Sequence, residues 1–329
     1  MTKRQLPRPR AARSIAHPLP AWMTALLLLS MLMMPAVKPQ AAPSAGEQAA
    51  PPPYDLNSLT WRALHFATSI MGMPLHAKMK ARILSRDEAQ RHLVSPREGH
   101  PIPPADAVLQ LEVFSSFIND KDIHTRLMIN PGNAAALQRT RVELTPGDER
   151  YKAYRFTGEG IFILRRVPRR GEAGKPFTEW TGTHESFIPY PGHHRRPGLA
   201  SDTAALLYMG SAANFTAPGD SRSFIAYFDD SFHVITMEYR GIEGVRADFR
   251  AGRQDAGSRR IMSYRDALRM TIRAHPLGHP NEESTLQIAG LEPPVELFID
   301  QEMRVPLELR GRFGFIGEIS LRLDRAELR

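Results

Sequence analysis

The chain has 329 residues, of which 42% are hydrophobic, so it is long enough for one large domain with a substantial core or for two ordinary ones. Cysteine is absent, which excludes disulfides, thiolate nucleophiles, iron–sulfur clusters and cysteine-type zinc sites. The formal net charge is +8, but six of the 43 basic residues and none of the acidic residues precede residue 43. The rest of the chain has 37 basic against 35 acidic residues, so we expect no nucleic-acid partner.

Residues 1–42 have the three-part pattern of a secretory signal. A basic stretch ends at Arg13, the apolar run AWMTALLLLSMLMMPAV follows over residues 21–37, and small and Pro-rich residues come next. The apolar run is close to the minimum of about 17 residues for a bilayer span. We predict export to the periplasm, with the segment either cleaved as a signal peptide or kept as an inner-membrane anchor. Membrane contact is expected only through this segment, and only if it is not cleaved.

Residues 43–53, PSAGEQAAPPP, are rich in Ala and Pro and are predicted to form a tether. From residue 54 to residue 329 we expect a single β-rich domain, because hydrophobic and polar residues alternate with a period of two. LHAKMKARIL, residues 75–84, is the first clear run. Three predicted hairpins follow: residues 109–117 with 123–129, KAYRF with GIFILRR, and SFIAYF with FHVITMEY across Asp229-Asp230-Ser231.

PVELFIDQEMRVPLELRG, residues 294–311, alternates twice and is predicted to supply the first two strands of a C-terminal three-stranded meander. The one convincing helix is SDTAALLYMGSAA, where Ser201 or Asp202 can cap the start and Gly210 lies near a plausible end. So many strands exceed what a flat twisted sheet of about ten strands accommodates. We therefore predict a mainly β fold: a large antiparallel, strongly curved sheet, built as a half-barrel or as two layers, with one short helix packed against it.

The densest polar cluster lies in the Pro-rich loop that precedes this helix. Adjacent imidazoles do not share one face and no acidic residue lies in the cluster, so an anionic group suits it better than a metal, and a solvated loop is the simplest interpretation. Asp202 and Tyr208 belong to the helix beside that loop, and Glu243 lies between two glycines at the end of a predicted strand. The candidate ligand-binding residues are therefore His193, His194, Arg195, Arg196, Asp202, Tyr208 and Glu243.

No motif in the chain fixes a reaction. The nucleophile elbow of hydrolases, the phosphate-binding loop and the dinucleotide fingerprint are absent, and His184-Glu185 does not continue into a zinc-protease motif. Asp229-Asp230 is interpreted as turn chemistry, because adjacent carboxylates at a hairpin tip diverge. We predict no catalytic residues, no metal and no cofactor.

Three segments of the second half resemble a known family. They are ASDTAALLYMGSAANF with Asp202, VITMEYRGIEGVRADF with Gly241 and Glu243, and PVELFIDQEMRVPLELRG with Asp300 and Pro306. As a set they are similar to the exported bacterial family called domain of unknown function 3108, over residues 200–324. The chain departs from that family at Leu297-Phe298-Ile299, and its GHHRRPG loop looks like an insertion. The resemblance implies a curved antiparallel sheet wrapped against a helix in an envelope protein with no established activity, and it brings no catalytic residues.

The leading hypothesis is a non-catalytic envelope protein that binds an apolar or amphipathic envelope molecule, or that acts as a scaffold for envelope assembly. A sheet with one apolar face that curls incompletely leaves a groove suited to lipid-like ligands. The partner is then a lipid-like ligand or an envelope protein. The alternative is a cell-wall hydrolase that uses the His193/His194 loop. It requires a carboxylate such as Glu185 or Asp202 within hydrogen-bond reach of an imidazole.

Overall fold

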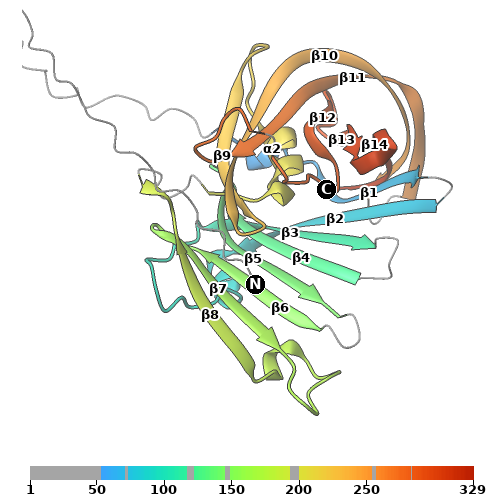
Figure 1. Ribbon diagram of the computed structural model, residues 1–329. Coiled ribbons are helices and arrows are strands. Elements are labelled where there is room, and N and C mark those ends of the chain that lie inside the picture. Colours follow the sequence, from blue (N-terminus) through green and yellow to red (C-terminus); the bar gives the residue numbers. More distant parts are fainter. Residues whose placement is uncertain are drawn as a thin grey trace, which may run out of the picture. The chain divides into compact units, whose positions relative to one another are not determined.

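One sheet of fourteen strands dominates the computed structural model, which describes residues 53–70, 73–116, 122–144, 149–192, 200–253, 257–282 and 284–329. The strand order is β8-β7-β6-β5-β4-β3-β2-β1-β14-β13-β12-β11-β10-β9 (Figure 1). The predicted mainly β fold, with a large curved antiparallel sheet and one short helix, is confirmed. The predicted leader and most of the predicted tether lie outside the described residues.

The first eight strands follow one another in the chain, and each is antiparallel to the next. Most connections are short, which favours pairing of consecutive strands, whereas residues 86–106 and residues 168–181 form longer connections before β3 and β8. The strands are β1 (Trp61–Ile70), β2 (Met73–Ser85), β3 (Ala107–Ser116), β4 (Asp122–Asn130), β5 (Ala135–Glu143), β6 (Arg150–Phe156), β7 (Gly160–Val167) and β8 (Gly182–Pro189).

The other six strands partly close on themselves. They are β9 (Ser221–Phe228), β10 (Ser231–Arg253), β11 (Gly257–Pro276), β12 (Glu292–Asp300), β13 (Pro306–Phe313) and β14 (Gly317–Leu328). The end of the long β10 pairs in parallel with the end of β14, residues 250–253 with residues 325–328. This pairing closes β10 to β14 into a ring of five strands, visible as the orange and red loop of ribbon in Figure 1. β14 also pairs with β1 and so joins the ring to the open part of the sheet.

The predicted helix is present within the predicted segment, residues 201–213. A 3-10 turn, η4 (Thr203–Ala205), leads into α2 (Leu206–Ala212), which passes through Gly210. A short helix that was not predicted, α1 (Arg86–Gln90), begins with a capping box between Ser85 and Glu88. Further 3-10 turns are η1 (Leu56–Ser58), η2 (Phe177–Glu179) and η5 (Gly314–Ile316).

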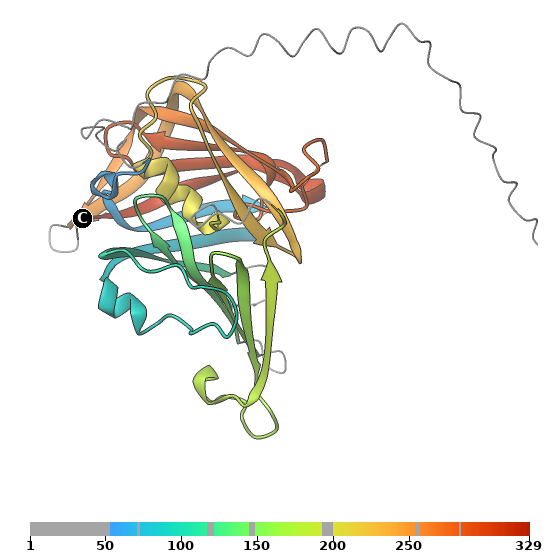
Figure 2. The same ribbon diagram turned by 90° about the vertical axis from the view of Figure 1, so that its left-hand side faces the viewer.

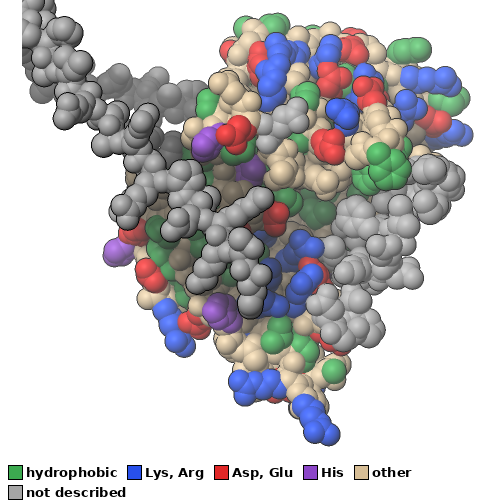
Figure 3. Space-filling view, in the orientation of Figure 1, with side chains coloured by type: hydrophobic (Ala, Val, Ile, Leu, Met, Phe, Trp, Pro, Cys, Tyr) green, Lys and Arg blue, Asp and Glu red, His purple; other side chains and the backbone are tan. Residues whose placement is uncertain are grey.

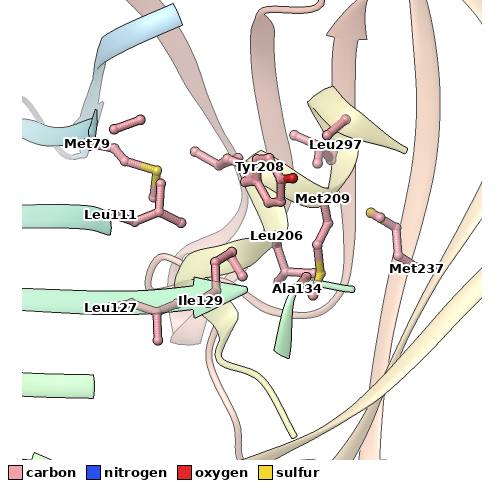
Figure 4. Packing of buried hydrophobic residues seen from close by; sticks show 14 of the residues in the cluster. Met79, Leu111, Leu127, Ile129, Ala134, Leu206, Tyr208, Met209, Met237 and Leu297 are labelled. Carbon is pink, nitrogen blue, oxygen red and sulfur yellow. The ribbon is translucent and has the colours of Figure 1, made fainter. Parts of the chain in front are cut away.

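The core lies around α2, all of whose residues are buried. Figure 2 shows the helix between the ring strands and the open part of the sheet. In Figure 4 the helix side chains Leu206, Tyr208 and Met209 lie between Met79, Leu111 and Ile129 on one side and Met237 and Leu297 on the other. Gly210 permits this close packing, since a Cβ atom there would be only 2.8 Å from Leu297 Cδ2.

The C-terminal meander is confirmed, with one difference in burial. Val295, Leu297 and Ile299 of β12 are fully buried, as the alternation predicts, but Phe298 and Asp300 of the opposite face are fully buried too. The guanidinium of Arg310 lies over the Phe298 ring at 4.9 Å. The guanidinium of Arg265 donates to Asp300 at 2.7 Å. Long arginine side chains therefore cover the face that alternation assigns to solvent.

Within the described residues, no helix is long and apolar enough to cross a membrane.

Candidate ligand-binding cleft

The three candidate residues that the structure describes, Asp202, Tyr208 and Glu243, do not line one common cleft. His193, His194, Arg195 and Arg196 lie outside the described residues. Tyr208 is fully buried inside the core, and its hydroxyl donates to the carbonyl of Pro131 at 2.9 Å. Of the three candidates that the structure describes, Asp202 is the one that borders the cleft treated below.

Glu243 does not end a strand as predicted. It lies within β10. The register between β10 and β11 shifts at a bulge between Tyr239 and Gly241. Gly241 has a φ of 108°, which favours glycine, so Gly241 marks a bulge and not a turn. The carboxylate of Glu243 accepts a hydrogen bond from Arg269 at 3.0 Å, and the same guanidinium also binds Glu296.

The cleft beside Asp202 has a volume of about 420 Å³. Its floor comes from the face of β1 to β6 that also carries the core, and α2 with its preceding turn forms one wall. The β9–β10 turn, residues 288–289 and two side chains of the ring strands complete it. The apolar lining consists mainly of Phe66, Met79, Val113, Leu206, Leu207, Ile288, Leu309 and Leu321.

A row of cross-strand neighbours runs over the floor from apolar to cationic. In the register of the sheet, Met79 pairs with Val113, Val113 with Thr125, Thr125 with Arg141, and Arg141 with Lys152. Directly opposite residues of paired strands point to the same face. The five side chains therefore form one continuous row, and all five residues line the cleft. Figure 3 shows Lys and Arg side chains gathered beside hydrophobic surface in the middle of the sheet.

The cationic end of the cleft is partly neutralised by carboxylates. Arg139, which also lines the cleft, donates to Asp202 at 2.7 Å and lies over the ring of Tyr154 at 4.1 Å. Burial lowers the pKa of Arg139, but Asp202 and Tyr154 together raise it by more, so the guanidinium stays charged. Arg141 pairs with Glu143 at 2.6 Å. Lys152 makes no ion pair or hydrogen bond with any residue that the structure describes.

The β9–β10 turn forms another part of the lining. Asp229 and Asp230 have φ angles of 46° and 59°, so both adopt the left-handed conformation of a tight hairpin turn, as the sequence predicted. The hydroxyl of Tyr227 donates to Asp230 at 2.9 Å. Burial is the main cause that raises the pKa of Tyr227, with a smaller contribution from this hydrogen bond. Asp230 therefore orders the turn, and the two carboxylates do not form an acid–base pair.

The sequence interpretation missed Arg139, Arg141 and Lys152. The sequence contains an indication of these residues. In ALQRTRVE, Arg139 and Arg141 alternate with the same period as Leu137, a buried residue of β5, and so lie on the same face of the strand. Arginines at positions where alternation predicts core side chains indicate either a buried ion pair or a cleft. Here they indicate both.

Neither carboxylate named for the hydrolase alternative is free. Asp202 is bound by Arg139 and accepts from the amide of Ala204 at 3.0 Å, and Glu185 pairs with Arg97 at 3.0 Å. Among the described residues, no three His, Asp or Glu side chains are grouped closely enough to hold a metal ion.

Comparison of the chain with protein-family models, with curated proteins and with solved structures found no match. The resemblance to the domain of unknown function 3108 family stays a prediction.

Proposed function

We propose that the protein is a non-catalytic envelope protein that binds a single-chain amphiphile with an anionic head in the cleft beside Asp202. The row from Met79 to Lys152 carries this proposal, because it offers an apolar surface and a cation in one continuous line. Export to the periplasm and membership of the domain of unknown function 3108 family belong to the same proposal.

The two ends of the row contribute differently to binding. Removal of apolar surface from water contributes about 25 cal/mol per Å², so affinity should rise with the length of the alkyl chain. Lys152 has no carboxylate partner among the described residues, so an anionic head would meet a charge that is not already neutralised. A volume of about 420 Å³ lies in the lower part of the range for small-molecule sites, which favours one chain over two.

Isothermal titration calorimetry with three probes tests the proposal. Dodecyl phosphate carries both chain and charge, dodecyl glucoside carries the chain alone, and inorganic phosphate carries the charge alone. We expect dodecyl phosphate to bind most tightly. If neither alkyl probe binds, or if dodecyl glucoside binds as tightly as dodecyl phosphate, the proposal fails in its apolar or in its charged part.

Substitutions in the cleft test whether the ligand binds there. Thr125→Phe fills the middle of the row without adding charge, so it should abolish binding of both alkyl probes. Lys152→Gln should weaken dodecyl phosphate selectively, by about threefold to tenfold. Lys175→Gln, at an exposed position of the segment between β7 and η2, is the matched control and should change neither affinity. Mass spectrometry of protein purified from its native host should detect a copurified single-chain lipid.

A further inference from the structure

We infer that a second cleft, where the end of the β10–β11 hairpin meets β1, β2 and β14, binds a ligand that presents two or more phosphate groups. This cleft has a volume of about 1150 Å³ and shares no lining residue with the cleft beside Asp202. Lys80 and Arg82 alternate with Met79 along β2, so they point to the opposite face of that strand. Because the two clefts share no lining residue, we treat them as separate sites.

The charge of this cleft is local. Six cationic side chains line it against two carboxylates, although the chain after residue 43 is close to neutral. The cations come from both ends of the domain's sequence and converge through the pairing of β14 with β1 and with β10. They are Arg62, Lys80, Arg82, Arg253, Arg325 and Arg329.

Arg82 pairs with Glu88 outside the lining at 3.3 Å, and the two carboxylates of the lining contact other residues. Glu112 accepts from Arg126 at 3.1 Å and from Gln110, and Glu327 lies 3.9 Å from His65. Lys80, Arg253 and Arg325 have no ion pair with a described residue, and all three are exposed. The pKa of Arg329 is lowered by burial and further by repulsion from Arg62, so like charges are crowded where an anion would relieve the repulsion.

The chemistry of these side chains selects phosphate. Five of the six cations are arginines, whose planar guanidinium matches a phosphate group with two parallel hydrogen bonds. The apolar side chains of the lining are Ala63, Ala81, Ala326 and Ile83, three of which are small. The volume exceeds what one phosphate needs. A multiply phosphorylated group, free in solution or carried as a lipid head group, fits both the charge and the room.

Two probes distinguish these sources. Tripolyphosphate in solution, measured by calorimetry at low salt, tests a free ligand. Vesicles of zwitterionic lipid with and without cardiolipin, which carries two phosphates, test a lipid head group by cosedimentation. Binding to tripolyphosphate supports a soluble ligand, and binding to cardiolipin vesicles alone supports a membrane ligand. If the protein binds neither probe, the inference is wrong.

The site is tested by Lys80→Gln, Arg253→Gln and Arg325→Gln combined, which removes three exposed charges without touching a buried group. The triple variant should weaken binding by about tenfold or more, because each exposed ion pair contributes a modest amount. Arg169→Gln, Arg170→Gln and Lys175→Gln combined remove three exposed charges elsewhere and should leave affinity within twofold. An equal loss in both triple variants would show unspecific attraction and overturn the inference. Lys152→Gln should leave it unchanged, which separates this site from the first.

Discussion

The guanidinium of Arg139 on β5 donates to the carboxylate of Asp202 at 2.7 Å, and the same carboxylate accepts from the backbone amide of Ala204 at the start of η4. The pair therefore connects the floor of the cleft beside Asp202 to the wall that α2 and its preceding turn form. The side chains of Arg139 and Asp202 are only 17% and 7% exposed. If either partner is removed, the remaining charge is too buried to be solvated well by water.

Asp202→Ala should lower the free energy of unfolding by about 3 kcal/mol, because it leaves the Arg139 charge buried without a partner. Asp55→Ala is the matched control, since Asp55 also caps a 3-10 turn by accepting from the amide of Asn57 but pairs with no buried arginine. Its cost should be about 1 kcal/mol. Urea denaturation measures both values, and equal costs would show that Asp202 acts as a cap alone.

Gly210→Val should destabilise the protein by about 1–3 kcal/mol, because the added atoms collide with a well-packed core. A Cβ atom at this position would lie 2.8 Å from Leu297 and 3.3 Å from Ile299. Gly244→Val in β10 is the control, since no atom lies within 4 Å of a Cβ atom there, and the change should be close to neutral. Thermal unfolding followed by circular dichroism compares the two variants, and a similar melting temperature would contradict the close approach of α2 to β12.

The stability of the fold should decrease in mild acid. His233 is buried between the hydroxyls of Ser231 and Ser284, at 2.8 and 2.9 Å, and burial is the main cause that lowers its pKa. The unfolded chain binds a proton with a pKa of about 6.5, so it takes up protons at a higher pH than the folded state does. The free energy of unfolding should therefore be greatest above pH ~6.5 and fall as the pH drops from there toward the folded pKa.

His233→Gln should flatten this fall, measured by urea denaturation between pH 5 and 8 in steps of about half a unit. His124, stacked on Phe114, also has a pKa lowered mainly by burial, and His124→Gln should remove a separate part of the same dependence. The two effects should add, because the residues lie on different strands without a shared partner. An unchanged slope in the double variant would contradict the assignment.

Arg155 is predicted to hold the loop before β3 against the sheet. Its guanidinium is buried and donates to the carbonyls of Leu137 at 2.6 Å, Phe156 at 3.2 Å and Ile102 at 3.0 Å. Burial lowers its pKa to about 10. Arg155→Lys should cost about 1–3 kcal/mol, because an ammonium group cannot span these divergent acceptors.

The same substitution should speed proteolysis within residues 94–106, since the contact with Ile102 is lost. Arg170→Lys, at an exposed position, should change the free energy of unfolding by less than about 0.5 kcal/mol and leave the cleavage rate unchanged. Unaltered cleavage in Arg155→Lys would show that the loop is held by other contacts.

Local patterns predicted most of the strands, because each strand pairs with a neighbour close in sequence, but β1, β5 and β8 were not predicted. The alternation of Val295, Leu297 and Ile299 and the turn at Asp229-Asp230 were enough to predict the meander and the β9–β10 hairpin. The ring was not predicted, because pairing of Arg250 with Arg325 joins segments whose sequences contain no sign of each other. The extended length of β10 was missed because glycines at 241 and 244 resemble a strand end.

The site was predicted less well for the same reason. Asp202 was recognised through its capping position, which is local, but its partner Arg139 is 63 residues away in the chain. Arg141 and Lys152 acquire their meaning only from the register that places them in one row with Val113 and Met79. His193 and His194 stand out in the sequence because polar residues cluster in their loop, whereas Arg139, Arg141 and Lys152 are spread over two strands.

β14 is hydrogen-bonded to β1, to β13 and to the end of β10, so Leu328 is opposite Trp61 although almost the whole domain separates them in sequence. During synthesis, β1 can pair with β2 early, but its other edge stays unpaired until β14 has been made. Contacts of such long sequence separation slow folding, so we expect the nascent domain to remain incomplete until its final twelve-residue strand is available. Until then another chain could pair with the open edge of β1, so we expect chaperones to bind the nascent domain there.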